Sequence, residues 1–262
     1  MIDIEIARWE EQAAKRLLGA TYEERLRLYS EIYDHDNAFW LARHRRTGIS
    51  GTCARNRELL HLACPGTGPV LDIGGGMGVA GDAFAPSREY VVCDASPPVS
   101  VHSGYGDTKR RTVVGYATDL PFPDASFDAV LMLDVLEHLH SEDIERSIVQ
   151  VRSVLRPRGR LLIATPNRIS GPWDCRRNLP DPHHHIGLHL NEMSVGDMLR
   201  LVRRHGFSAV GFQTTHSNAR LFSLQPLTFW AGVWEGIAGC VPWHHRPRFC
   251  SLAVVLAIKA TR

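Results

Sequence analysis

Glycines cluster directly after an acidic residue at the end of one apolar run in this 262-residue chain. Val70-Leu71 leads into Asp72, and the residues that follow include Gly74, Gly75, Gly76 and Gly78. Glycines in a turn let the backbone approach a ligand closely, and free N–H groups at the start of a helix point at that ligand. The pattern therefore predicts a buried strand, a ligand-binding turn and then a helix.

Acidic residues also end or follow the next apolar runs. Tyr90-Val91-Val92-Cys93 ends in Asp94, beside Ala95, and an acid at the end of a second strand can accept hydrogen bonds from two ribose hydroxyls. Further on, Asp119 lies beside Leu120, a pair suited to the exocyclic amine and the apolar face of an adenine. Together these positions predict a nucleoside-containing ligand.

Two groups of residues could remove a proton or bind a metal. Asp134, Glu137 and His138 have i, i+3, i+4 spacing and would share a face if a helix began at Asp134. His183-His184-His185 and His189 lie between Pro182 and a later predicted helix. His185 and His189 are four residues apart, but Pro182 and Gly187 favour a loop. Either histidine could act as a general base, and a solvated polar loop is the alternative.

The ordered motifs from Pro69 to Arg168 resemble class I S-adenosylmethionine-dependent methyltransferases, in the small-molecule subgroup that includes ubiquinone-type O-methyltransferases. The resemblance continues more loosely from His185 to Phe207. It implies a doubly wound, mostly parallel seven-stranded sheet with an antiparallel edge, and a product, S-adenosylhomocysteine. It also implies catalytic roles for His138, His185 or His189.

The resemblance assigns the cofactor residues one by one. The three alternate glycines would shape the methionine and sulfonium end, while Asp72 would orient the loop or bind the amino group through water. Asp94 would bind the ribose, Asp119 and Leu120 the adenine, and Leu133 would form the inner wall. Some ubiquinone O-methyltransferases carry an acid-x-x-Glu-His metal site where this chain has Asp134, Glu137 and His138. We expect no metal here, with Mg²⁺ at these three residues as the alternative.

Composition limits the other classes of function. Lys and Arg number 30 against 28 Asp and Glu, so the net charge of +2 predicts no nucleic-acid footprint. The six cysteines form no C-x-x-C pair and no signal peptide is visible, which favours a reducing cytoplasm. The glycine spacing also differs from that of nicotinamide oxidoreductases, which is the remaining enzyme class that we considered.

The chain divides into a predicted helical cap, residues 1–54, and a methyltransferase domain, residues 55–262. Strands and helices alternate from about 55 to 168, which is typical of a doubly wound sheet. Helix is expected over Glu192–His205, with strands at Phe207–Thr215 and Leu252–Lys259. The 169–191 loop and the apolar insert 218–248 are expected to form a substrate lid.

Aromatic and aliphatic residues are concentrated in 221–243. Pro226, Glu235 and Pro242 interrupt the segment, so we predict no membrane span. A lid helix is one interpretation, and a surface that contacts a lipid substrate or a membrane is the other. The sequence thus predicts O-methylation of a small acceptor in biosynthesis, with an apolar or lipid-linked acceptor as one form of it. The alternatives are C- or N-methylation, or a non-catalytic regulatory protein that binds S-adenosylmethionine.

Overall fold

The computed structural model describes residues 2–44, 57–76, 78–96, 110–169, 171–174, 176, 185–214 and 252–261. The predicted insert 221–243 lies outside these residues, as do His183 and His184. The helices are α1 (Ile2–Gly19), α2 (Tyr22–His44), α3 (Arg57–Ala63), α4 (Ser141–Val154) and α5 (Val195–Arg204), with 3₁₀ turns η1 (Val79–Ala83) and η3 (Leu136–His138). The strands are β1 (Val70–Ile73), β2 (Tyr90–Asp94), β3 (Arg110–Val114), β4 (Phe127–Leu133), β5 (Leu155–Pro166), β6 (Phe207–Thr214) and β7 (Leu252–Lys259).

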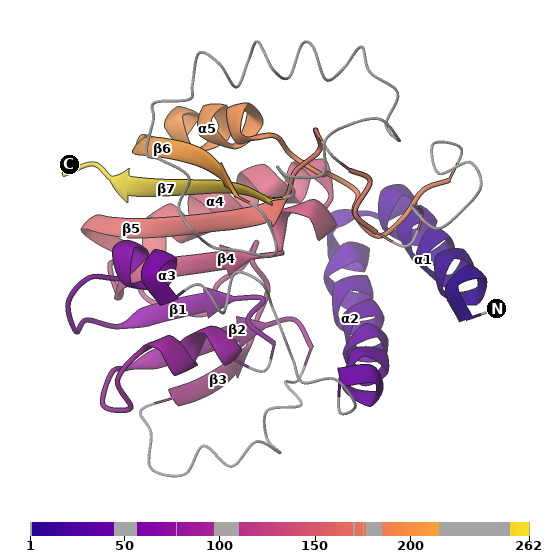
Figure 1. Cartoon of the computed structure of the whole chain (residues 1–262), viewed down its shortest axis with the longest axis horizontal. Helices are drawn as coiled ribbons and strands as arrows, with labels where there is room; N and C mark the ends of the chain where they lie inside the picture. Colours follow the sequence, from indigo (N-terminus) through magenta and orange to yellow (C-terminus); the bar gives the residue numbers. More distant parts are fainter. Residues whose placement is uncertain are drawn as a thin grey trace.

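The strands form one seven-stranded sheet in the order β3-β2-β1-β4-β5-β7-β6 (Figure 1). Strands β1 to β5 run parallel, while β7 is antiparallel to both β5 and β6. The predicted fold class is therefore confirmed, including the antiparallel edge. In the register, Ile73 pairs with Cys93 and with Met132, so β1, β2 and β4 end side by side.

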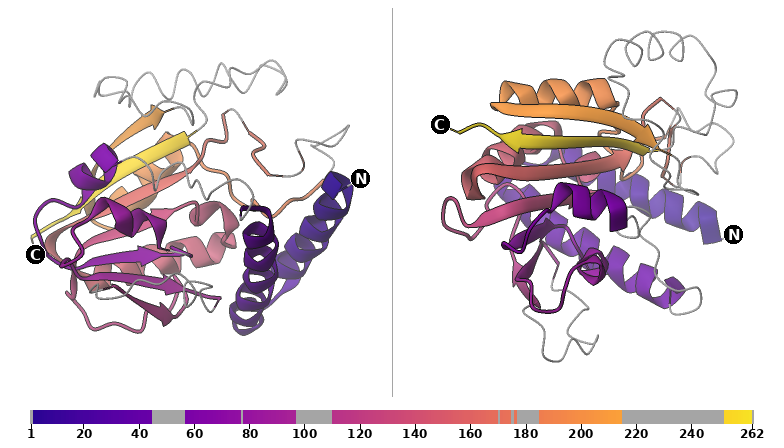
Figure 2. Two further views of the ribbon diagram at one scale, coloured as in Figure 1. Left: turned by 60° about the horizontal axis from the view of Figure 1, so that its bottom comes forward. Right: turned by 60° about the vertical axis from the view of Figure 1, so that its left-hand side comes forward.

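Apolar side chains cover both faces of the sheet, as a doubly wound fold requires. One core combines the sheet with α4, α5 and residues of α1 and α2, including Leu17 and Ile148. The other combines it with α3 and η1, including Leu60 and Ala80. Helices α1 and α2 cross the end of the sheet at which the parallel strands finish (Figures 1 and 2).

Local signals explain where two of the helices begin and end. Glu24 accepts a hydrogen bond from Thr21 N at 2.8 Å, and Thr21 Oγ1 accepts one from Glu24 N at 3.4 Å. This reciprocal pair is a capping box, and it starts α2. Helix α5 begins in the same way at Ser194, and Gly206, at φ +78°, follows its end. Gly206 ends this helix, because glycine adopts the left-handed conformation without a steric penalty.

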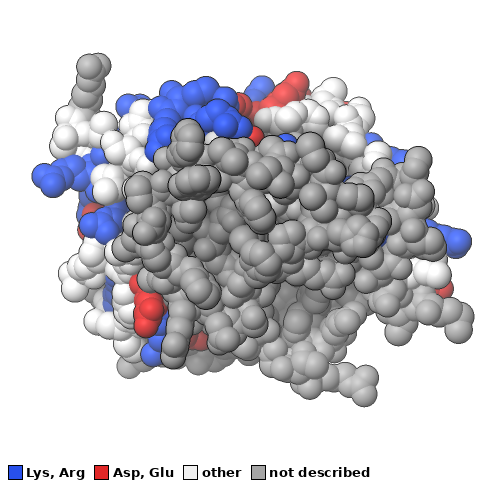
Figure 3. All heavy atoms as spheres, turned by 45° about the horizontal axis from the view of Figure 1, so that its top comes forward, with Lys and Arg blue, Asp and Glu red and all other residues white. Residues whose placement is uncertain are grey.

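Several charged side chains on the surface form ion pairs. Arg168 and Arg200 both contact Asp197, at 2.9 and 2.6 Å, and Arg204 contacts Glu145. On the face drawn in Figure 3, the described basic side chains gather beside acidic ones at the upper edge. Among the described residues, no helix has both the length and the apolar character needed to cross a bilayer.

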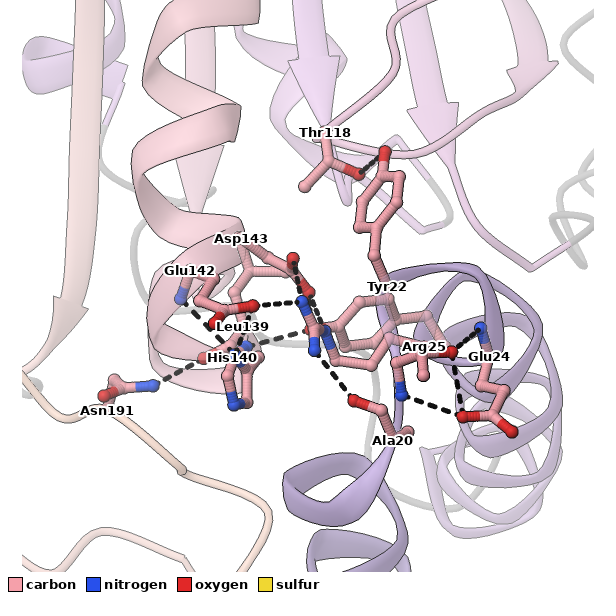
Figure 4. Close-up of polar contacts among 12 residues, drawn as sticks. Ala20, Tyr22, Glu24, Arg25, Thr118, Leu139, His140, Glu142, Asp143 and Asn191 are labelled. Atoms are coloured by element: carbon pink, nitrogen blue, oxygen red, sulfur yellow. Dashed lines mark hydrogen bonds and ion pairs between the residues drawn. The ribbon is translucent and has the colours of Figure 1, made fainter.

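A buried ion pair attaches α2 to the start of α4 (Figure 4). Arg25 Nε and Nη2 donate to the two carboxylate oxygens of Asp143, at 2.7 and 2.8 Å, and Nη2 also reaches Glu142 at 3.0 Å. Arg25 is 2% exposed and Asp143 is fully buried. The Tyr29 hydroxyl donates to Asp143 at 2.9 Å and accepts from His140 N. This network fixes the position of α2 over the strand ends.

Replacing Arg25 by methionine should lower the free energy of unfolding by about 3–5 kcal/mol, because the Asp143 carboxylate would stay buried without its cation. Urea denaturation measures the effect. Glu31→Gln is the matched control, because it breaks the Arg16–Glu31 pair, whose side chains are 51% and 61% exposed. Adding Asp143→Leu to the Arg25 variant should restore much of the loss. A loss no larger than that of the control would contradict the assignment.

Candidate active site

A cavity opens where β1, β2 and β4 end, beneath α2. Ile73, Gly74 and Gly76 contribute from β1 and its turn, and Cys93, Asp94 and Ala95 from the end of β2. Residues 115–118, which follow β3, form another wall. The far end is formed by Tyr29 and Tyr33 of α2 and by the segment after β4, namely Asp134, Val135, His138 and Leu139. Open α/β sheets bind ligands at this edge.

The glycine loop needs glycine for conformation and for space. Gly74 and Gly76 have φ of +66° and +50°. A Cβ on Gly74 would lie 2.6 Å from Cγ2 of Val135, whereas one on Gly76 would enter open space. Gly75 and Gly78 do not line the cavity, although Gly78, at φ +68°, begins η1. The element after the loop is this five-residue 3₁₀ turn rather than the longer helix that the sequence suggested.

Asp94 connects β2 to the glycine loop and is 8% exposed. Its Oδ2 accepts from Gly76 N and its Oδ1 accepts from Ser96 N, each at 3.0 Å. Burial raises the pKa of this carboxyl, while the backbone donors oppose the shift. Each carboxylate oxygen has a second lone pair. Asp94 can therefore still accept hydrogen bonds from hydroxyls that enter the cavity.

Asp72 lies behind the loop and does not line the cavity. The Tyr90 hydroxyl donates to its Oδ2, while Oδ1 has no hydrogen-bond partner among the described residues. A Cβ on Gly75 would lie 2.4 Å from this carboxylate, so Asp72 packs directly under the turn. Burial raises the pKa of Asp72 to about 7. Of its two predicted roles, this placement favours orientation of the loop.

The raised pKa of Asp72 predicts a pH-dependent stability. The unfolded carboxyl releases its proton near 3.8 and the folded one near 7, so the folded state binds more protons between these values. Wild-type stability should therefore fall, relative to Asp72→Asn, as the pH rises from about 4 to about 7. Urea denaturation across this range tests the prediction, with Asp128→Asn as control, because Asp128 is partly exposed and pairs with Arg156. A constant difference between wild type and Asp72→Asn would contradict it.

The residues that line the cavity after β3 are not those predicted to bind the adenine, but they are adjacent to them in the sequence. Ala117 and Thr118 line the cavity, whereas Asp119 and Leu120 do not. Asp119 is exposed in a turn closed by its N–H to Tyr116 O at 3.0 Å, and Leu120 is buried. Leu133, predicted as the inner wall, packs against the core on the α3 side of the sheet. These assignments remain predictions about the cofactor-bound protein.

The segment after β4 places its three candidate residues in different surroundings. Asp134 has φ +56°, in the left-handed region that Asp tolerates better than most residues, and its N–H bonds Ala164 O at 2.8 Å. Asp134 lines the cavity. Glu137 is fully buried, and its Oε2 accepts from Thr165 Oγ1 at 2.9 Å. The expected shared helical face does not form, because only the short turn η3 follows β4.

The three candidate histidines do not all lie at one place. His138 lines the cavity, with Nδ1 3.2 Å from Leu188 O and its ring edge-on to Tyr33 at 5.5 Å. His189 lies next to it, with ring centroids 4.8 Å apart and Nδ1 3.0 Å from Glu192 Oε1. His185 does not line the cavity, and its Nδ1 lies 3.2 Å from Glu11 Oε2 of α1. The structure thus brings His138 and His189 together and leaves His185 at the cap.

The sequence did not predict several residues at the end of the cavity that α2 and the segment after β4 form. Tyr29 and Tyr33, which belong to the predicted helical cap, line the cavity. Glu192 was assigned to the start of a helix, but it precedes α5 and holds both His189 and the N–H of Trp173, at 2.6 Å. No sequence signal marks Glu192 as a partner of His189 beyond their i, i+3 spacing.

Burial sets opposite charge states for the neighbouring groups. Desolvation, followed by the charge of His189, lowers the pKa of His138 to about 3, so this ring is neutral. Burial alone would lower the pKa of His189, but the hydrogen bond to Glu192 and the nearby Glu137 raise it to about 9. Although Asp134 is exposed at the cavity, enough protein surrounds its carboxylate that desolvation raises its pKa, against the effect of His189. Burial and Asp134 together raise the pKa of Glu137.

Comparison with known proteins agrees with this architecture. Residues 71–163 match the family described as a methyltransferase domain. A Mycolicibacterium smegmatis protein, described as a probable S-adenosylmethionine-dependent methyltransferase, is 32% identical over 142 residues, which are 53% of this chain and 51% of that protein. The O-methyltransferase resE of Aspergillus sclerotiorum is 28% identical over 160 residues, or 58% of this chain and 59% of that protein.

A solved structure aligns over a larger share of the fold. It is Burkholderia thailandensis 1,6-didemethyltoxoflavin-N1-methyltransferase, with bound 1,6-didemethyltoxoflavin and S-adenosylhomocysteine. The TM-score is 0.60 at 19% identity, and the match covers 93% of this chain and 92% of that chain. At this identity the likeness concerns the fold. The aligned part of this chain spans about half the length of the curated mycobacterial relative.

The sheet order, the glycine loop with its acids and the family match of residues 71–163 agree with one another. All three are typical of a class I S-adenosylmethionine-dependent methyltransferase domain.

Proposed function

We propose that this protein transfers a methyl group from S-adenosylmethionine to an oxygen atom of a small molecule. The observation that carries the proposal is the single cavity that joins the glycine loop and Asp94 at one end to Asp134 and His138 at the other. One end suits a nucleoside and the other a hydroxyl acceptor. The similarity to an O-methyltransferase and to an N-methyltransferase supports methyl transfer without selecting the acceptor atom.

The residues of the cavity fit this cofactor. Asp94 would accept the ribose hydroxyls, because it lines the cavity and its oxygens retain lone pairs. The open space beside Gly76 would admit the methionine end close to the backbone. Ala117 and Thr118, next to the predicted Asp119 and Leu120, would face the adenine. The bound cofactor supplies a methyl group that the positive charge of its sulfonium already activates.

The chain itself would position the acceptor and receive its proton. Asp134 is the group that we assign as the base, because it lines the cavity and has a raised pKa. His138 is a weaker base, since its pKa of about 3 means that it holds a proton poorly near neutral pH. Its neutral ring can instead orient the acceptor hydroxyl. His189 would carry a positive charge next to Asp134 and His138.

Other activities remain distinct alternatives within the same fold. C- or N-methylation would need no strong base, and a regulatory protein would bind S-adenosylmethionine without turnover on an acceptor panel. An apolar or lipid-linked acceptor is proposed from the composition of residues 221–243, which lie outside the described residues. The same composition motivates the proposal that the protein contacts membranes peripherally. A cytoplasmic location is proposed from the cysteines, which form no C-x-x-C pair.

Binding of S-adenosylhomocysteine is the first test. Isothermal titration should give a micromolar dissociation constant, and Asp94→Ala should weaken binding by about 1–3 kcal/mol, because charge-assisted hydrogen bonds to the ribose are lost. Asp128→Ala serves as control, since Asp128 pairs with Arg156 away from the cavity. Binding of NADH in place of S-adenosylhomocysteine would refute the proposed function. An unchanged affinity in Asp94→Ala would refute the ribose assignment.

The pH dependence of turnover tests the assignment of Asp134 as the base. With an acceptor found in a panel of hydroxyl compounds, kcat/KM should rise with pH through an apparent pKa above the ordinary 3.8 of aspartate, because only the ionised Asp134 accepts a proton. Asp134→Asn should remove this limb and lower kcat about 10²- to 10⁴-fold. His185→Ala should retain wild-type activity, since His185 bonds Glu11 away from the cavity. A full acid limb in Asp134→Asn would exclude Asp134 as the base.

A further inference from the structure

Three side chains next to the acceptor end converge as metal ligands would. Glu137, His138 and His189 each present a ligand atom within 4.8 Å of those of the other two. Glu137 and His138 belong to η3, whereas His189 lies 51 residues after His138, in the segment that precedes α5. Asp134, part of the site suggested by the sequence, is not a member of this group.

Each of the three side chains also has a hydrogen-bond partner of its own. Thr165 Oγ1 donates to Glu137 Oε2 at 2.9 Å, and Leu188 O lies 3.2 Å from His138 Nδ1. Glu192 Oε1 lies 3.0 Å from His189 Nδ1. Metal-binding histidines characteristically donate their other N–H to a carbonyl or a carboxylate, which fixes the tautomer and the ring orientation. The Nε2 atoms of both rings are therefore left for a ligand.

The remaining oxygen of the carboxylate has no hydrogen-bond partner. Glu137 Oε1 is fully buried and unbonded among the described residues, at 3.9 Å from His138 Nε2. An unsatisfied buried carboxylate oxygen is costly unless a cation or a donor reaches it. Ligands of a tetrahedral ion lie about 3.4 Å apart, so about 1 Å of inward movement would bring the three atoms onto one ion. Such a shift is within the range of side-chain rotation.

We propose that Glu137, His138 and His189 bind one divalent transition-metal ion of the zinc or cobalt type, with an open coordination position toward the cavity. Two imidazole nitrogens and one carboxylate select such ions over magnesium, which prefers oxygen ligands. The position is open toward the cavity because His138 lines it. Binding would displace the Nε2 proton of His189 to solvent, so the ion would take over its positive charge.

The site is argued from this geometry alone, but its role in catalysis depends on the proposed function. An ion at this place could contact the acceptor oxygen and lower the pKa of its hydroxyl, which would ease proton transfer to Asp134. Glu192 would be a positioning residue, because it contacts His189 and not the ion.

Metal binding to the intact protein tests the proposal. Protein stripped with EDTA and dialysed should bind one equivalent of Zn²⁺ or Co²⁺ at micromolar concentration or tighter, and Co²⁺ should give visible absorption bands typical of a low coordination number. Glu137→Gln, which preserves the shape of the side chain, and His189→Ala should each weaken binding at least about 100-fold. Glu192→Gln should weaken it about 10- to 100-fold. Circular dichroism verifies that each variant is folded.

Two control variants distinguish this site from two other candidate metal sites. A variant with His183, His184 and His185 all replaced by alanine should keep the single equivalent, because this histidine run is the most obvious adventitious metal binder in the sequence. Asp134→Asn should also keep it, whereas a site built on Asp134, Glu137 and His138 would lose it. Metal loss in either control, with retention in His189→Ala, would overturn the proposal.

The behaviour of the wild-type protein is equally decisive. No binding of Zn²⁺ or Co²⁺ at micromolar concentration, or a preference for Mg²⁺, would overturn the site. S-adenosylhomocysteine binding is measured in parallel on the same samples. If it persists while no metal binds, the proposed function stands and the metal site falls. If metal binds but S-adenosylhomocysteine does not, the metal site stands and the proposed function falls.

Discussion

The organisation of this molecule depends on the parallel pairing of β1 with both β2 and β4. Parallel strands in register end at the same edge, so residues that follow each strand meet although they are far apart in sequence. Ile73, Cys93 and Met132 lie side by side, and the loop or acid after each of them reaches one cavity. The hydrogen bonds from Gly74 N to Cys93 O and from Gly76 N to Asp94 link two of these strand ends directly.

The cap depends on a different kind of contact. Helix α2 contributes Tyr29 and Tyr33 to the cavity, but its position is set by the buried pair of Arg25 and Asp143. A buried ion pair of this type adds specificity more than net stability, because desolvation offsets much of the attraction. Its value here is geometric: Tyr29 bonds both Asp143 and the N–H of His140, at the start of α4. The cavity wall and the helix N-terminus are thereby held as one unit.

The acceptor end combines groups whose protonation states oppose one another. His138 is neutral because burial and the neighbouring cation lower its pKa, and His189 is charged because Glu192 and Glu137 raise its pKa. Glu137 has no solvent contact, and one of its oxygens has no hydrogen-bond partner among the described residues. Asp134 and His138 line the cavity, and Glu137 and His189 lie next to them. Groups with perturbed pKa values cluster at functional sites.

The sequence alone determined the fold class and the antiparallel edge of the sheet, and it singled out Gly74, Gly76, Asp94 and Ala95, which line the cavity. Their contacts with a cofactor stay a prediction. The features that the sequence determined depend on local patterns: apolar runs, glycines in a turn, the Thr21–Glu24 capping box and Gly206 after a helix. The acceptor end was decided only by the tertiary structure. Glu137 lies in the short 3₁₀ turn η3 and not on one helix with Asp134. The loop before α5 brings His189 to His138, while His185 bonds α1. Spacing could not show this, because the conformation of a loop depends on the distant surfaces against which it packs.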